Sequence, residues 1–170
     1  MIDFTTIDYL KTGNKKQQRA YELLTAYRIF EKLKDHSPIL AGTIPIEIDI
    51  EGSDLDIICE MKCHMEFESL LTDTFSEFNI KVESLEINGD EAVVGNFILE
   101  EFPVEIFGQN KPAAKQNAYR HMITEYSILQ EKGENFKKEI IALKKQGIKT
   151  EPAFGLLLGL KNPYEDLLKF

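Results

Sequence analysis

The feature that most restricts the fold of this chain is an alternation of acidic and apolar residues in Gly52-Ser53-Asp54-Leu55-Asp56-Ile57-Ile58. Alternate side chains of a strand share one face, so Asp54 and Asp56 are predicted to project together from an otherwise apolar strand. At about 3.3 Å per residue, their Cα atoms lie roughly 6.6 Å apart. Two carboxylates held this close beside a buried strand need a neutralising partner, because an isolated desolvated carboxylate is unfavourable. A divalent cation is the partner that this pattern favours.

A later apolar run supplies a third acid. Glu105 is the only acid within Phe102-Pro103-Val104-Glu105-Ile106-Phe107, which is predicted to be a strand. If this strand lies near the first, three oxygen ligands meet on one sheet face, a set that suits Mg²⁺ or Mn²⁺ with positions left for substrate phosphates. The alternative is that these acids are solvated ends of strands.

A glycine and a hydroxyl come shortly before the paired acids. Gly42 and Thr43 follow the apolar run Ile39-Leu40-Ala41, and Thr43 precedes Asp54 by eleven residues. A glycine lets backbone amides approach an anion closely, and the following hydroxyl can donate to a phosphate oxygen. A simple turn at the end of a strand is the alternative interpretation.

Hydrophobic periodicity predicts an α+β fold with a helical C-terminal part. Helical spacing is predicted over about 15–34, where Asn14 and Gln17 resemble a capping box, and again over 67–78. Period-two alternation predicts a strand over 44–51. The other predicted elements are strands at 39–41, 55–58, 92–99 and 104–107, a turn at Asn88-Gly89-Asp90, helices at 113–130 and 135–145, and a short helical tail after Pro163.

Charge divides the 170-residue chain into two parts. Residues 1–108 hold 9 basic and 22 acidic side chains, whereas residues 109–170 hold 11 and 7. We therefore expect an α+β core over 1–108 and a C-terminal helical region over 109–170 packed on it. The net charge of −9 argues against a surface that grips long nucleic acid or anionic lipid.

Two further features bear on location. The longest apolar stretch, Ala153 to Leu160, is far shorter than the ~20 residues of a membrane-spanning helix. The chain has two cysteines and no basic, apolar leader at its start, so we expect a cytoplasmic protein without disulfides.

Three segments together resemble the signature of the nucleotidyltransferase superfamily, which has a DNA polymerase beta-like fold. They are Leu40-Ala41-Gly42-Thr43, Gly52-Ser53-Asp54-Leu55-Asp56-Ile57 and Val104-Glu105-Ile106. Nearly the whole chain, including the segments 116–122 and 147–154, is also similar to a bacterial group named domain of unknown function 4269. The sequence departs from the commonest superfamily pattern at Thr43, where serine is usual, and in the predicted strand at 44–51, where many members have a short helix.

The resemblance implies a Mg²⁺-dependent enzyme that moves a nucleoside monophosphate from a nucleoside triphosphate to a small-molecule or protein acceptor. It implies that Asp54, Asp56 and Glu105 are catalytic metal ligands. Gly42, Thr43 and Ser53 are then expected to hold the phosphates. Compensation for the triphosphate charge is expected from the basic C-terminal part, where the candidates are Lys115, Arg120 and Lys149. The alternative for these three basic residues is that they are solvated surface residues. The alternative for the whole protein is a catalytically inactive module that binds a nucleotide or a partner protein and regulates.

Overall fold

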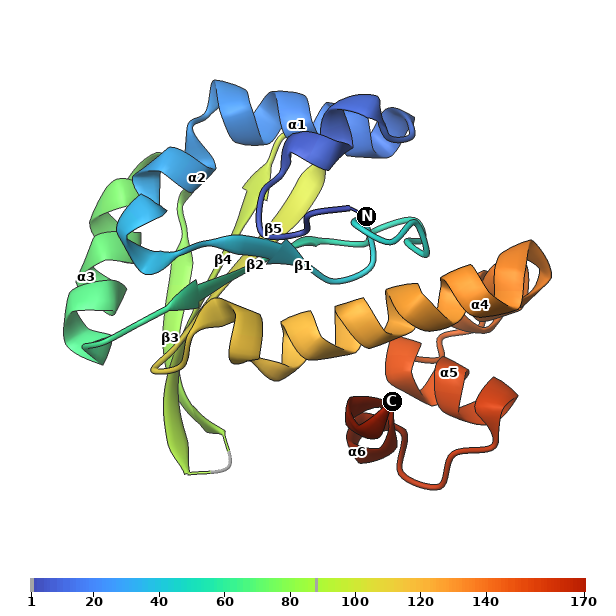
Figure 1. Cartoon of the computed structure of the whole chain (residues 1–170). Coiled ribbons are helices and arrows are strands. Elements are labelled where there is room, and N and C mark those ends of the chain that lie inside the picture. The colour runs from blue at the N-terminus through green and yellow to red at the C-terminus, as the bar shows by residue number, and fades with distance from the viewer. Residues whose placement is uncertain (1, 88) are drawn as a thin grey trace.

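The computed structural model describes residues 2–87 and 89–170. The chain forms a mixed β-sheet with flanking helices, as the sequence predicts (Figure 1). The predicted turn at Asn88-Gly89-Asp90 includes Asn88, which lies outside the described residues. The helices are α1 (Lys15–Ala26), α2 (Ile29–Lys32), α3 (His64–Thr74), α4 (Asn117–Lys145), α5 (Thr150–Leu158) and α6 (Pro163–Asp166), with short 3-10 turns η1 (Asp8–Thr12), η2 (Lys34–His36), η3 (Ser76–Phe78), η4 (Ala113–Lys115) and η5 (Leu167–Lys169).

Within these described residues, five strands form one sheet in the order β1-β2-β5-β4-β3. The strands are β1 (Ile39–Ala41), β2 (Leu55–Glu60), β3 (Lys81–Ile87), β4 (Asp90–Leu99) and β5 (Phe102–Gln109). β2 and β5 run parallel, whereas the other neighbours are antiparallel. The parallel pair lies in the middle of the sheet and brings together two segments that are about fifty residues apart in the sequence.

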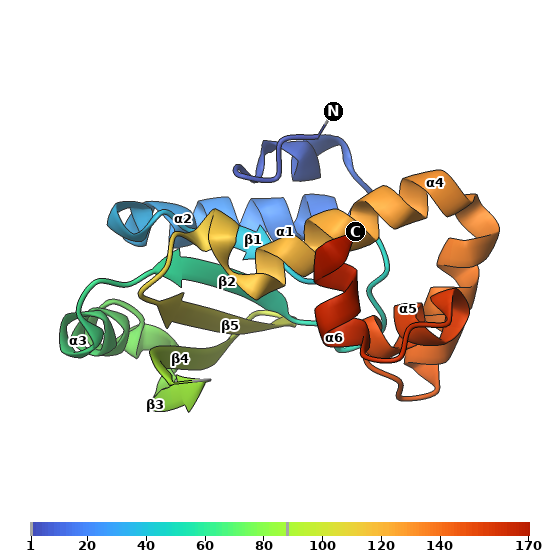
Figure 2. The same ribbon diagram turned by 60° about the horizontal axis from the view of Figure 1, so that its bottom comes forward.

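The two faces of the sheet pack against different hydrophobic cores. On β2, Leu55, Ile57 and Cys59 belong to a hydrophobic core shared with α1, α2 and α3. Ile58 points to the opposite face and joins a second core shared with the N-terminal segment, α4 and α5. Because strand side chains alternate, Asp56 faces the same side as Ile58. The acid-bearing face of the sheet is therefore the one that the C-terminal helices approach (Figures 1 and 2).

The predicted strand over 44–51 is wrong. The backbone there forms turns and irregular structure, with Glu47 in the left-handed region at φ 59°. The alternating isoleucines are buried in different places, because Ile44 enters the first core while Ile46 and Ile48 enter the second. The alternating isoleucines thus belong to a loop that passes between two cores, in which Pro45 is buried as well.

Because this loop does not pair with a strand, side chains supply hydrogen bonds to its backbone. Gln17 Nε2 on α1 donates to the carbonyl oxygens of Ile44 and Pro45, at 3.0 and 3.1 Å. From α4, Lys144 Nζ donates to the carbonyl of Ile48 at 2.7 Å. Buried carbonyls require such partners. The loop is therefore held by hydrogen bonds from α1 and from α4.

Two helical predictions differ from the structure in detail. The predicted helix over 15–34 ends at Ala26, because Arg28 has a φ of 54°, and α2 follows as a separate short helix. Its predicted capping box between Asn14 and Gln17 is confirmed. The predicted interruption between the helices at 113–130 and 135–145 is a single non-helical residue, Gly133 (φ 78°), inside α4.

The sequence interpretation missed β3, whose residues are almost all exposed at the edge of the sheet. Both cysteines are free thiols, Cys59 buried and Cys63 exposed. No helix in the described part of the chain is long and apolar enough to cross a membrane.

Candidate active site

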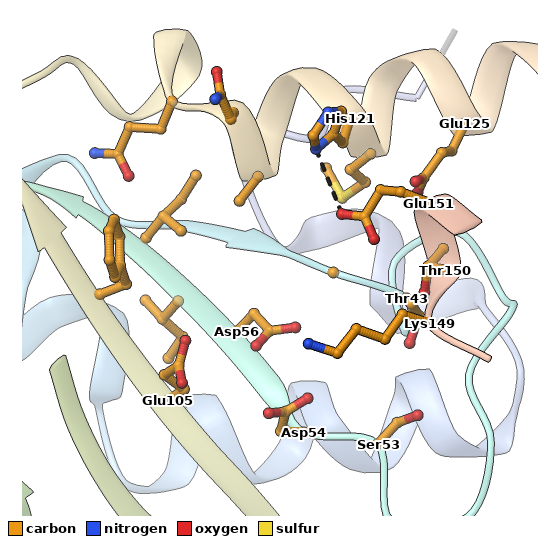
Figure 3. A pocket seen from close by; sticks show the side chains of 18 of the residues that line it. Thr43, Ser53, Asp54, Asp56, Glu105, His121, Glu125, Lys149, Thr150 and Glu151 are labelled. Atoms are coloured by element: carbon orange, nitrogen blue, oxygen red, sulfur yellow. Dashed lines mark ion pairs between the residues drawn. The ribbon is translucent and has the colours of Figure 1, made fainter. Parts of the chain in front are cut away.

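The pairing of β2 with β5 brings the three predicted acids together. Asp56 is the direct neighbour of Glu105 in the parallel register, and Asp54 comes just before β2. All three side chains line one cavity of about 820 Å³ between the sheet and the C-terminal helices. Figure 3 shows them on the sheet side of this cavity. The sequence prediction that a later strand delivers the third acid to the first two therefore holds in the geometry.

The electrostatics of this sheet wall are unfavourable for the protein alone. Burial, together with the charges of Asp54 and Glu105, raises the pKa of Asp56 to about 8. Burial and the charge of Asp54 also raise the pKa of Glu105. Within residues 2–87 and 89–170, none of the three acids forms a salt bridge with a lysine, arginine or histidine. The acids repel one another, and the positive charge of Lys144 offsets this repulsion at Asp56 only in part.

Gly42 provides the space that the Asp56 carboxylate occupies. Its φ of 81° is in the left-handed region, and a Cβ added there would clash with Asp56 Oδ2. Both observations require glycine at this position. Ala41, the preceding residue, is the β1 neighbour of Asp56, so the end of β1 lies against the acid pair.

The donor set fits a hard divalent cation. Three carboxylates without salt bridges, one of them with a strongly raised pKa, are what such an ion would neutralise. In the described part of the chain, no three His, Cys, Asp or Glu side chains are already close enough around one point to hold a metal ion. Asp54, Asp56 and Glu105 are the residues that would hold one.

The predicted phosphate-binding residues line the same cavity. Gly42, Thr43, Ser53 and Lys149 are all among its lining residues. Ser53 Oγ accepts a hydrogen bond from the backbone N–H of Ile50 at 2.9 Å, which shapes the turn leading into β2. Lys149 is the N-cap residue of α5, and its side chain extends across the cavity towards Asp54 and Asp56 (Figure 3).

Lys115 and Arg120 do not line this cavity, contrary to the sequence prediction. Both are exposed. Arg120 is turned towards the C-terminus, with Nη1 donating to Asn117 Oδ1 and Nη2 to the Leu168 carbonyl, at 3.4 and 3.5 Å. The α4 face that carries His121, Met122 and Glu125 is the one that meets the cavity, and Arg120 points away from it.

The helical wall carries an ion pair, His121 with Glu151, and a buried acid without one, Glu125. His121 Nδ1 lies 3.5 Å from Glu151 Oε1, and His121 Nε2 donates to the Tyr164 carbonyl at 2.8 Å. Burial opposes a charged His121, but these two contacts prevail and raise its pKa, and the same pair lowers the pKa of Glu151. Burial and the charge of Glu151 raise the pKa of Glu125 to about 8.

Sequence reasoning missed most of this helical wall. It assigned no role to His121, Glu125, Glu151, Lys144 or Gln116, all of which line the cavity. A usable signal was present in α4, where Glu125 is a carboxylate on the apolar helix face that also contains Met122, Ile128 and Leu129. Charged residues are rarely buried without a specific partner.

Comparison with known proteins shows which family the chain belongs to. The model of the family described as Domain of unknown function (DUF4269) matches residues 22–170. The chain belongs to this family. No curated protein matches the chain.

Solved structures show what fold the DUF4269 chain has. It is similar to the Cid1 poly(U) polymerase with Mg and 3'-dATP bound, with a TM-score of 0.54 and 13% identity over 78% of this chain and 41% of that one. It is also similar to the polymerase core of TRAMP, an RNA surveillance complex, with a TM-score of 0.55 and 11% identity over 95% of this chain and 50% of that one. The chain thus has the nucleotidyltransferase fold and spans half or less of these chains' lengths.

Proposed function

We propose that this protein is a Mg²⁺-dependent nucleotidyltransferase, which moves a nucleoside monophosphate from a nucleoside triphosphate to an acceptor hydroxyl. The observation that carries the proposal is the register of β2 and β5, which sets Glu105 beside Asp56 and close to Asp54 in a cavity. Mg²⁺, when bound, would neutralise part of the triphosphate charge and polarise the α-phosphate.

The chain's own residues bind the cation and the phosphates. Asp54 and Asp56 hold the cation and orient the triphosphate against it. The backbone amides at Gly42 and Thr43, the Ser53 hydroxyl and the Lys149 ammonium bind the phosphates that leave as pyrophosphate. Catalysis rests on positioning and charge compensation.

Glu105 is assigned to the attacking group. Its carboxylate lies beside Asp56 in the cavity, where it can accept a proton from a hydroxyl placed next to the triphosphate. The acceptor hydroxyl loses its proton to Glu105 while its oxygen bonds to the α-phosphorus. The bond between that phosphorus and the bridging oxygen to the β-phosphate breaks, so pyrophosphate departs.

We propose a small molecule or a protein side chain as the acceptor, because the net charge of −9 disfavours a long polyanion. RNA is the second candidate, since the solved neighbours include a poly(U) polymerase and a cytoplasmic RNA terminal U-transferase. A nucleotide-binding module without transferase activity is the third, and it differs from the first two in having no turnover.

Thermal unfolding with Mg²⁺ and each nucleoside triphosphate tests the nucleotide and metal parts together. At a hundred times its dissociation constant, a ligand stabilises the wild type by about 2.7 kcal/mol. The Asp54→Asn/Asp56→Asn variant should lose the Mg²⁺-dependent part of this gain. Equal stabilisation of both proteins would contradict the metal site. Tight binding without transfer of an α-labelled monophosphate to any acceptor would favour the regulatory module.

A further inference from the structure

The cavity changes character along β5. Glu105, Phe107 and Gln109 alternate on its cavity side, so Gln109 lies about 13 Å from Glu105 along the strand. Between them the lining is apolar, with half-buried Phe107, the neighbouring Ile58 on β2, and Met122 on α4. Beyond this floor the lining becomes rich in amides. The three sheet acids therefore stand at one end of the strand pair and the amides of Gln109 and Gln116 at the other, where Lys111 and Asp90 also line the cavity.

Gln116 is the unusual residue of the amide end. It is 1% exposed and precedes α4, but its side chain makes no capping hydrogen bond to the helix. Its Nε2 donates instead to the carbonyl oxygens of Cys59 and Lys111, at 2.8 and 3.0 Å. Its Oε1 is buried and has no hydrogen-bond partner within the described residues.

These contacts fix what Gln116 can offer. Both amide hydrogens are committed to backbone carbonyls, so the side chain cannot rotate to exchange its oxygen and nitrogen without losing both bonds. Gln116 lines the cavity, and its remaining polar group is a rigid hydrogen-bond acceptor. A buried acceptor left unpaired destabilises a protein, and a ligand that supplies an N–H donor removes that penalty.

We propose that this end of the cavity is a nucleobase subsite, in which the flat face of a base lies on Phe107 and an N–H of its edge donates to Gln116 Oε1. An aromatic side chain next to an apolar floor suits the face of a base, and a fixed acceptor beside further amides suits its edge. This inference rests on the proposed function and adds the group that selects the nucleotide. The base belongs either to the triphosphate or to the terminal nucleotide of an acceptor.

Matched ligands test the subsite on the wild-type protein. Each nucleoside triphosphate is compared with its counterpart methylated at the N–H of the base edge, for example UTP with N3-methyl-UTP and ATP with N6,N6-dimethyl-ATP. With Mg²⁺ present and no acceptor, calorimetry should show affinity falling by about 10- to 100-fold in the preferred pair. Inorganic triphosphate, measured alongside, reports the phosphate site without a base.

Two variants assign the effect to these residues. Gln116→Met removes the acceptor, so the methylated and unmethylated partners should bind equally. Gln130→Met, an exposed position on the same helix, should keep the discrimination. Phe107→Leu keeps an apolar side chain but removes the ring, and should weaken every nucleoside triphosphate by about 5- to 100-fold while leaving inorganic triphosphate unchanged. If Gln116→Met does not fold, the comparison of methylated and unmethylated nucleotides on the wild type and the binding measured for Phe107→Leu still test the subsite.

A second arm distinguishes the two sources of the base. Short RNA oligonucleotides that end in uridine or in N3-methyluridine are offered as acceptors with a single labelled triphosphate. Discrimination in triphosphate binding assigns the subsite to the donor nucleotide, and discrimination in acceptor binding alone assigns it to the acceptor. Triphosphate binding with no response to methylation in either arm would overturn the subsite and leave the proposed function standing. No binding of inorganic triphosphate or any nucleotide would instead overturn the proposed function.

Discussion

The two walls of the cavity differ in whether their acids include an ion pair. On the sheet wall, Asp54, Asp56 and Glu105 lie side by side without a salt bridge in the described residues. On the helical wall, Glu151 is paired with His121, which is itself held by a backbone carbonyl. The three sheet acids thus have no ion-pair partner in the described residues, whereas Glu151 has one. Glu125, which lies beside Glu151, resembles the sheet acids in having a pKa raised to about 8.

This difference indicates which wall needs a ligand. Acids that are compensated internally contribute to the fold and to the shape of the cavity. Acids that are crowded together without compensation destabilise the protein unless a cation binds, as the raised pKa of Asp56 records. Substitutions on the sheet wall should therefore affect activity and metal binding more than stability, and substitutions on the helical wall should do the reverse.

The largest expected effect is that of Asp56→Asn. This change removes one of the proposed cation ligands, so transfer of the labelled monophosphate should fall by at least about 100-fold. In a chelating buffer the variant should unfold at a higher temperature than the wild type, because the raised pKa of Asp56 means that folding must either bury its charge or take up a proton. Asp73→Asn, an exposed acid on α3, is the control and should change neither property. An Asp56→Asn protein with full activity would remove the distinction between the walls.

Lys144→Met should affect stability more than chemistry. Lys144 is 7% exposed, and its Nζ supports the Ile48 carbonyl in the loop between β1 and β2. Losing this charged hydrogen bond and leaving the carbonyl unpaired should lower the free energy of unfolding by about 2 kcal/mol, measured by urea denaturation. The neighbouring Lys145 is exposed, so Lys145→Met should change it little. Equal effects of the two substitutions would show that the loop does not depend on Lys144.

Substitutions of Lys149 and Lys115 distinguish the effect of a lysine's position in the cavity from the effect of its charge alone. Lys149→Ala should raise the dissociation constant of a non-hydrolysable triphosphate by about tenfold, because a charged group facing the phosphates is lost. Lys115→Ala removes the same charge outside the cavity and should leave binding within about twofold. Calorimetry in one buffer measures both. A similar loss in both variants would mean that net charge, and not position, governs the binding.

The smallest effect concerns the helical wall and depends on pH. The raised pKa of His121 means that its pairing with Glu151 stabilises the fold at pH 6, and that this gain disappears as pH rises through the folded-state pKa of His121, above 6.5. Glu151→Gln should cost about 1 kcal/mol at pH 6. At pH 9 the cost should vanish, since His121 is neutral and ionised Glu125 no longer faces a second carboxylate.

Urea denaturation at both pH values checks this expectation, with Glu165→Gln as an exposed control. A pH-independent cost of Glu151→Gln would mean that the residue stabilises the fold by packing alone.

The sheet wall was predictable from the sequence, while the helical wall was not. The pattern at Asp54 and Asp56 is local, and Glu105 stands alone in an apolar run, so period-two reasoning found all three acids. The isoleucines at 44–51 gave the same signal for a different reason, because the loop distributes Ile44 and Ile48 between two cores. A one-dimensional pattern reports alternating burial and does not report what the residues are buried against.

The helical wall depends on tertiary contacts that leave no local pattern. Gln116 became notable only through its bonds to Cys59 and Lys111, which lie on other elements. Arg120 was chosen for its charge, yet the rotation of α4 turns it away from the cavity. The orientation of a helix about its own axis is set by its packing, so basic residues in α4 could not be ranked from the sequence.

The most direct test is a crystal structure with Mn²⁺ and a non-hydrolysable nucleoside triphosphate, in which anomalous scattering locates the metal. The proposed metal site predicts a peak in contact with carboxylate oxygens of Asp54, Asp56 and Glu105, with the triphosphate beside it. A triphosphate bound in the cavity without a metal peak at these acids, or with the peak at the Glu125 and Glu151 pair, would contradict the assignment.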